Sequence, residues 1–235
     1  MLVFIKVIRM YIVFCFRAIR TAYHDQAYDK KYNINTLTFP VLTINHAENP
    51  SKYNDGTVCD STAYSTLSRI LSSVKVSEND VFVDLGCGLG RAVCCIAGKR
   101  LKKVIGIEIV KKYAERAGNN YANHVPQLAT PAEIIVGDVA VFKEQEGTIY
   151  FIYNPFGYRT IKAVIENIRE SLEANQRTIR IIYYCCLHEG YFNDAPWLEP
   201  DPEFTGVENV RAWRNRPCQE YAGKTSIIDS QAMSR

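Results

Sequence analysis

The segment that most constrains the fold runs from Val81 to Arg91 and reads Val-Phe-Val-Asp-Leu-Gly-Cys-Gly-Leu-Gly-Arg. Its apolar start predicts a buried strand, its glycines predict a tight turn, and the residues after Arg91 predict a helix. A second apolar strand is predicted over 104–109, and it ends in an acid, Glu108. Strand, glycine turn, helix and strand in this order indicate one half of a nucleotide-binding α/β sheet.

The spacing of the glycines narrows the choice of ligand. They alternate, whereas a dinucleotide pyrophosphate needs glycines at the first, third and sixth positions, and the sixth position holds Arg91. Asp84 places a carboxylate two residues before the first glycine, where it repels a phosphate and can pair with an ammonium. Glu108 lies where an acid binds both hydroxyls of a ribose. These residues predict a ligand that joins a nucleoside to an amino acid.

The pattern resembles the class I S-adenosylmethionine-dependent methyltransferases, whose first motif is Asp-x-Gly-x-Gly-x-Gly and whose second strand ends in an acid. Gly137-Asp138 after an apolar run resembles the third-strand acid of this family, which lies beside the adenine amino group. The resemblance implies S-adenosylmethionine as the cofactor and no metal. The cofactor-binding residues that it implies are Asp84, Gly86, Cys87, Gly88, Gly90, Glu108, Ile109, Asp138, Val139 and Asn154.

Asn154, Pro155 and Phe156 are the predicted catalytic residues, because they follow the fourth strand, where the family has its catalytic loop. An amide oxygen and a backbone carbonyl can accept hydrogen bonds from an attacking amine, and Phe156 can stack on a planar acceptor. The loop is similar to the Asn-Pro-Pro-aromatic loop of amino-group methyltransferases, without its second proline. It also resembles the small bacterial-type methyltransferases with an Asn-Pro-Phe loop. An ordinary turn after a strand is the alternative.

The alternation of strands and helices predicts the fold class. We expect an α/β fold with a mostly parallel sheet, helices on both faces and an N-terminal helical extension. The resemblance to the methyltransferase family implies that the sheet is doubly wound, has seven strands and ends in an antiparallel edge hairpin near the C-terminus. Apolar spacing predicts a helix over 161–172 and a strand over 179–184, and candidates for the closing hairpin are 208–213 and 225–229.

Three regions are predicted along the chain. They are a basic amphipathic helix over 1–22, a cap with a substrate loop and a helix over 23–75, and the S-adenosylmethionine-binding domain over 76–235. Within the second region, residues 60–62, Asp-Ser-Thr, are expected to cap a helix that begins near Tyr64.

Residues 1–20 are strongly apolar yet carry Lys6, Arg9, Arg17 and Arg20, which a helix places on one side. The uncharged run is too short for a membrane span, and the charges do not have a signal-peptide arrangement. This helix is expected to pack on the domain or across a homodimer, or to attach peripherally to anionic lipid. With eight cysteines that lack metal or redox spacing, the chain is expected to be cytoplasmic, either free or at the inner membrane surface.

Four other features have a functional and a structural interpretation. Tyr64 can reach the methyl donor or simply pack, and Arg91 can bind the donor carboxylate or pair with an acid. Among the histidines, which show no metal spacing, His188 is the most plausible general base. Residues 211–216, Arg-Ala-Trp-Arg-Asn-Arg, are a short candidate strip for nucleic acid or a solvated sheet edge.

We therefore expect an S-adenosylmethionine-dependent methyltransferase that methylates an amino or amide nitrogen by in-line transfer, with a protein side chain favoured as acceptor. The alternatives are an adenine-type nucleic-acid base methyltransferase and a non-catalytic S-adenosylmethionine-binding module. Some features also resemble the histone-modifying seven-strand lysine methyltransferases, which place a substrate-shaping N-terminal part before the Asp-x-Gly motif. Loops 21–60 and 186–225 contain no motif that names the acceptor.

Overall fold

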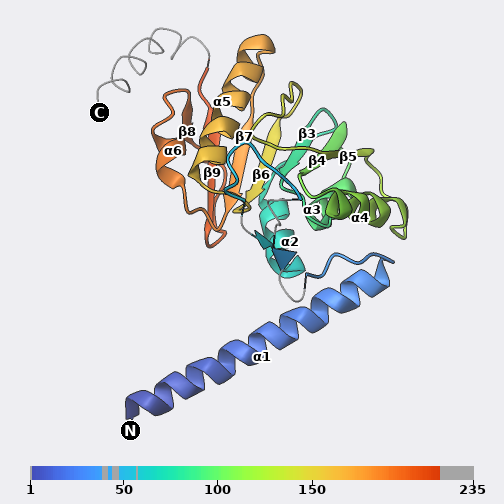
Figure 1. Cartoon of the computed structure of the whole chain (residues 1–235), viewed down its shortest axis with the longest axis vertical. Helices are drawn as coiled ribbons and strands as arrows, with labels where there is room; N and C mark the ends of the chain where they lie inside the picture. Colours follow the sequence, from blue (N-terminus) through green and yellow to red (C-terminus); the bar gives the residue numbers. More distant parts are fainter. Residues whose placement is uncertain (1, 39–41, 44–47, 57, 218–235) are drawn as a thin grey trace.

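The structure, a computed structural model, describes residues 2–38, 42–43, 48–56 and 58–217 (Figure 1). Its main sheet has seven strands in the order β5-β4-β3-β6-β7-β9-β8. The strands are β3 (Val81–Leu85), β4 (Lys103–Glu108), β5 (Ala132–Val136), β6 (Ile149–Tyr153), β7 (Arg180–Tyr184), β8 (Leu198–Pro200) and β9 (Val210–Asn215). Strands β3 to β7 pair in parallel, and β9 pairs antiparallel with β7 and β8.

This topology confirms the predicted mostly parallel sheet with an antiparallel hairpin at its C-terminal edge. The hairpin candidate at 208–213 corresponds to β9, whereas the candidate at 225–229 lies outside the described residues.

The sheet is buried on both faces, so successive side chains of one strand enter two different cores. In β3, Val81, Val83 and Leu85 pack on one face, where helices α5 and α6 lie, and Phe82 packs on the other face with α2, α3 and α4. The helices are α2 (Tyr64–Ser73), α3 (Arg91–Ala97), α4 (Lys111–Ala122), α5 (Tyr158–Ala174) and α6 (Glu189–Asn193). Continuous apolar runs in the central strands are what a doubly covered parallel sheet requires.

Strand β3 has β4 on one side and β6 on the other, so the direction of winding reverses there. In such sheets a crevice opens at the carboxyl ends of the strands beside the reversal, and ligands bind in it. The glycine turn at 86–90 leaves β3 at this point.

Helix α1 (Leu2–Lys31) is longer than the predicted helix over 1–22 and leads into the domain at its C-terminal end (Figure 1). A two-stranded antiparallel sheet, β1 (Leu42–Thr43) with β2 (Val58–Cys59), follows it. Within the described ranges, no helix is long and apolar enough to cross a membrane.

The predicted cap of the helix near Tyr64 is wrong. Helix α2 has Ala63 at its N-cap, without a side-chain cap hydrogen bond. Instead, the backbone N–H of Tyr64 donates to the carboxylate of Asp25 in α1 at 3.1 Å. The carboxylate of Asp60 accepts from its neighbour Ser61 and from Thr38. A first-turn amide needs an oxygen acceptor, and a side chain distant in sequence supplies it.

Candidate active site

The carboxyl ends of four adjacent strands bring most of the predicted site residues to one edge of the sheet. Asp84 lies in β3, Glu108 ends β4, Asp138 follows β5 and Asn154 follows β6. Because these strands are parallel neighbours, residues between 84 and 154 in the sequence converge on the crevice beside β3.

The glycine turn is shaped by close backbone contacts. Gly86 has a φ of +84°, and the N–H groups of Gly86 and Cys87 both donate to the carbonyl of Ile107 at 2.9 Å. A Cβ added at Gly86 would lie 2.8 Å from Cγ of Pro155, so the turn directly contacts the predicted catalytic loop. A Cβ at Gly90 would lie 2.9 Å from Cβ of Ala117 in α4, so this glycine permits close packing of the turn on a helix.

Asp84, which the sequence predicted to bind the cofactor, is a buried acid next to the glycine turn. Its side chain is only 4% exposed, and among the described residues its carboxylate has no hydrogen-bond partner. Burial, followed by the nearby charge of Glu108, raises the pKa of Asp84 to about 8. A buried carboxylate without a partner is costly, and a cationic ligand group would relieve that cost.

Glu108 binds the protein backbone at two points. Its carboxylate accepts from the N–H of Gly88 and from the N–H of Val110, both at 2.9 Å. Burial raises its pKa, and these hydrogen bonds oppose the rise. The acid predicted to bind a ribose therefore also fixes the glycine turn to the end of β4, a role that the sequence alone did not indicate.

Asp138 connects the end of β5 to an N-terminal segment. Its carboxylate accepts from the N–H of Ala140 at 2.8 Å and from the N–H of Lys52 at 2.6 Å. The sequence predicted a substrate loop within residues 23–75, and the described residues 48–56 of this region contact the crevice.

The same segment is held at the other side of the crevice by Asp55. Its carboxylate accepts from the N–H groups of Arg159 and Thr160 and from the hydroxyl of Thr160, which caps the start of α5. Gly56 also forms an isolated antiparallel bridge with Phe156. Sequence reasoning missed Asp55, because an acid before a glycine is an ordinary turn signal.

The cavity between these groups is narrow, with a volume of about 50 Å³. Seven predicted site residues line it, namely Gly86, Glu108, Ile109, Asp138, Val139, Pro155 and Phe156, together with Ser51, Gly56, Ile107, Gly137 and Thr160. The other predicted site residues do not line it, namely Asp84, Cys87, Gly88, Gly90 and Asn154. The sulfur of Cys87 lies beside Gly106 in the core.

The predicted catalytic loop is held in a fixed geometry. Asn154 has a φ of +37°, in the left-handed region that asparagine tolerates better than most residues. Its side-chain oxygen accepts from the hydroxyl of Tyr183 in β7 at 2.8 Å. Asn154 is thus oriented by a tyrosine, and its oxygen retains one lone pair for a further donor.

An acid and two tyrosines lie next to this loop. The hydroxyl of Tyr153 donates to the exposed carboxylate of Asp60 at 3.2 Å, and its ring lies 4.9 Å from that of Tyr184, measured between centroids. Burial raises the pKa of Tyr153 above its usual value. The sequence offered no signal for this cluster, since Asp60 lies 93 residues from Tyr153.

Arg91 and Tyr64 have structural roles. Arg91 pairs with Asp25 at 2.5 Å and donates to the hydroxyl of Thr36, while its guanidinium lies 4.3 Å from the centre of the Tyr64 ring. The hydroxyl of Tyr64 donates to Asp29. Of the two interpretations of Arg91, the structure supports pairing with an acid, and the structural interpretation of Tyr64 also agrees with the structure. His188 precedes α6, with its ring 6.2 Å from that of Tyr191.

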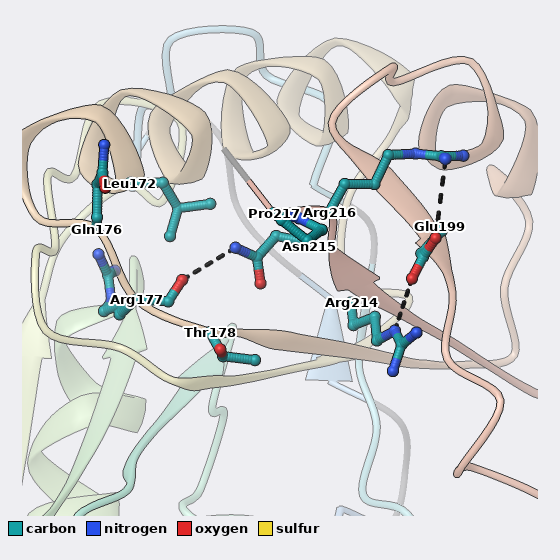
Figure 2. A pocket seen from close by; sticks show the side chains of 9 residues that line it. All are labelled: Leu172, Gln176, Arg177, Thr178, Glu199, Arg214, Asn215, Arg216 and Pro217. Atoms are coloured by element: carbon teal, nitrogen blue, oxygen red, sulfur yellow. Dashed lines mark hydrogen bonds and ion pairs between the residues drawn. The ribbon is translucent and has the colours of Figure 1, made fainter. Parts of the chain in front are cut away.

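A larger pocket of about 390 Å³ lies at the opposite edge of the sheet (Figure 2). It is formed by the end of α5, the start of β7 and the end of β9, and no predicted site residue lines it. Arg214 and Arg216 share the carboxylate of Glu199, as Figure 2 shows, and Arg211 pairs with Glu189. The three arginines of the predicted strip thus each pair with an acid.

A family described as "Histone methylation protein DOT1" matches residues 42–129. A Drosophila melanogaster protein named "Histone-lysine N-methyltransferase, H3 lysine-79 specific" is 33% identical over 189 residues, which are 74% of this chain and 10% of that protein. This chain therefore spans about a tenth of that relative. A SAM-dependent O-methyltransferase structure from Thermotoga maritima has a TM-score of 0.51 at 18% identity and covers 68% of each chain. The chain has the fold of the class I methyltransferases.

Proposed function

We propose that this chain is an enzyme that binds S-adenosylmethionine and transfers its methyl group to the amino group of a protein side chain. The observation that carries the proposal is Asp84, a buried carboxylate without a hydrogen-bond partner among the described residues, beside a glycine turn. The match to a histone methylation family and the histone-lysine N-methyltransferase name of the relative support both the reaction and the kind of acceptor.

The residues of the crevice fit this cofactor. Asp84 would pair with the amino acid ammonium, Glu108 would accept from the ribose hydroxyls, and Asp138 would accept from the adenine amino group. When bound, S-adenosylmethionine supplies a methyl group on a positively charged sulfur. An adenosyl ligand with a phosphate tail is disfavoured, since two acids, Asp84 and Glu108, lie beside the turn and no cationic side chain is among the cavity-lining residues to bind the phosphate.

For this reaction, the main task of the protein is to position the acceptor against the methyl group of the donor. An in-line displacement needs the acceptor lone pair aimed at the methyl carbon, and holding two reactants in such a geometry supplies a large part of the rate. Asn154, fixed by Tyr183, can accept a hydrogen bond from an attacking amine. The backbone carbonyl of Asn154 precedes Pro155, so no amide hydrogen competes at that bond. Segment 48–56 can exclude water when it closes on the crevice.

The residues next to the predicted catalytic loop favour a cationic amine as the methyl acceptor. Asp60 is an exposed carboxylate beside Tyr153 and Tyr184, and an acid next to aromatic faces attracts an ammonium group. A lysine side chain has this chemistry, whereas a nucleic-acid phosphate would be repelled. The nucleic-acid alternative also needs unpaired basic groups, and the arginines at 211, 214 and 216 pair with carboxylates.

The test is transfer of label from S-adenosylmethionine with a labelled methyl group into a fractionated cell lysate. We expect the label in the protein fraction, and acid hydrolysis of this fraction should release it as methylated lysine. Label in nucleic acid would overturn the choice of acceptor, and label in no fraction would favour a non-catalytic binding module.

Asn154→Ala separates catalysis from binding. The variant should lower turnover by about 10² to 10³, the range seen when one oriented polar group is lost at a reacting centre, while preserving cofactor affinity. Asn119→Ala, at an exposed position of α4, is the matched control and should retain full turnover. Unchanged turnover in Asn154→Ala would contradict a catalytic role for the loop.

A further inference from the structure

The described side-chain contacts between helix α1 and the domain lie near the C-terminal end of the helix. Near its C-terminal end, Asp25 and Asp29 are buried and bond to Arg91, Thr36 and the hydroxyl of Tyr64. Toward the N-terminus the helix leaves the domain, and its first residue lies far from the sheet (Figure 1). The described attachment of α1 to the domain therefore lies in its last two turns, and we refer to residues 2–24 as the arm.

The described side chains on the free part of this arm are exposed and largely apolar. Phe16 is 70% exposed, Ile19 is 67% exposed and Tyr23 is 72% exposed. Their spacing of three and four residues places them along one side of the helix. Three large apolar side chains in eight residues of one exposed helix exceed the single scattered residues that ordinary surfaces carry.

The charge of the arm is one-sided as well. The first 24 residues contain four basic residues, Lys6, Arg9, Arg17 and Arg20, and no acidic residue. The whole chain has 28 Lys and Arg against 25 Asp and Glu, so the remainder has 24 basic residues against 25 acidic ones. The net positive charge of this protein is thus located in α1.

We propose that residues 2–24 of α1 form a docking surface for a lipid membrane that carries anionic headgroups. A helix with exposed apolar side chains and only basic charges lies in the membrane interface, where apolar groups enter the acyl boundary and cations face the headgroups. The arm is about 35 Å long at 1.5 Å per residue, enough to lie along a bilayer surface. Within the part of the chain that the structure describes, no helix qualifies as a membrane span.

The charge of the arm favours an anionic membrane over a second copy of the chain as its binding partner. Two paired arms would bring eight basic residues together with no acid in either arm, and like charges at helix contacts are destabilising. An anionic lipid surface neutralises the same charges. Each basic residue near such a surface contributes about 1 kcal/mol of binding.

The experiment is co-sedimentation of the full chain with vesicles of phosphatidylcholine containing 30 mol% phosphatidylglycerol, compared with phosphatidylcholine alone. We expect binding to the anionic vesicles that weakens in high salt. Arg17→Glu/Arg20→Glu should weaken it by at least about 30-fold, the equivalent of two lost basic contacts. Phe16→Ser/Ile19→Ser should weaken it as well, because the apolar anchors are removed.

The matched control is Arg100→Glu/Lys111→Glu, which changes the net charge equally at two exposed positions outside α1. This variant should bind vesicles like the wild type, and circular dichroism should show every variant folded. Equal loss in the control would show a general charge effect and overturn the proposal. Absence of vesicle binding by the folded wild type, or a dimer in light scattering that α1 variants dissociate, would overturn it too.

Discussion

Asp25→Ala tests how much the N-terminal helix contributes to the stability of the domain. The carboxylate of Asp25 pairs with Arg91 at 2.5 Å and accepts from the N–H of Tyr64, and both members of the ion pair are almost fully buried. Among the residues that the structure describes, Nη2 of Arg91 already lacks a hydrogen-bond partner. The substitution would leave a buried guanidinium without its counter-charge, which costs about 3 to 5 kcal/mol of unfolding free energy.

For a chain of this size, about 2 to 4 °C of Tm corresponds to each kcal/mol, so we expect Tm to fall by about 6 to 20 °C. Chemical and thermal unfolding followed by circular dichroism measure both quantities. Asp25→Leu combined with Arg91→Met should recover most of the loss, because no buried charge remains. Glu189→Ala, which breaks an exposed pair with Arg211, should cost less than about 1 kcal/mol.

A free energy of unfolding for Asp25→Ala within about 1 kcal/mol of the wild-type value would contradict this prediction, since the buried ion pair would then contribute no more than a surface pair. A double variant as unstable as Asp25→Ala would show that the loss comes from packing and not from the isolated charge.

Three further predictions concern the crevice. The pKa of Asp84 is about 8 in the folded chain and about 3.9 in the unfolded chain, so between these values only the folded state holds the proton. The free energy of unfolding should therefore fall by about 1.4 kcal/mol per pH unit between about pH 5 and pH 7. Urea titrations at several pH values should show this slope in the wild type and not in Asp84→Asn. Asp55→Ala removes the acceptor for Thr160 at the start of α5 and should cost about 1 to 2 kcal/mol in the same titrations, with no loss if the cap is dispensable. Tyr183→Phe releases Asn154 and should lower kcat while leaving donor affinity unchanged, as single-turnover kinetics can verify.

The sequence predicted the fold and the site correctly where a single strand or turn determines the local geometry. The fully buried strand β3, the acid that ends β4 and the loop after β6 are local patterns, and parallel pairing brings them together without further information. The seven-strand topology follows from the same patterns.

Contacts between distant segments could not be predicted in this way. Asp25 and Arg91 are 66 residues apart, Lys52 and Asp138 are 86 apart, and Asp55 and Thr160 are 105 apart. Each pairs a polar residue of the N-terminal region with the domain, and such residues look like ordinary turn or helix-surface residues in isolation. The predicted helix ends at residue 22, whereas α1 ends at Lys31, for the same reason. In the sequence alone Asp25 resembles a solvated residue, and only the fold brings it next to Arg91.

Isothermal titration calorimetry of the full chain with S-adenosylmethionine and with its demethylated product measures the cofactor binding on which the proposed function depends. We expect saturable binding of one molecule per chain, at least about tenfold weaker in Asp84→Asn and in Glu108→Ala, since each variant loses a charge-assisted contact. Absence of heat with well-folded wild-type protein, or binding that both variants leave unchanged, would contradict it.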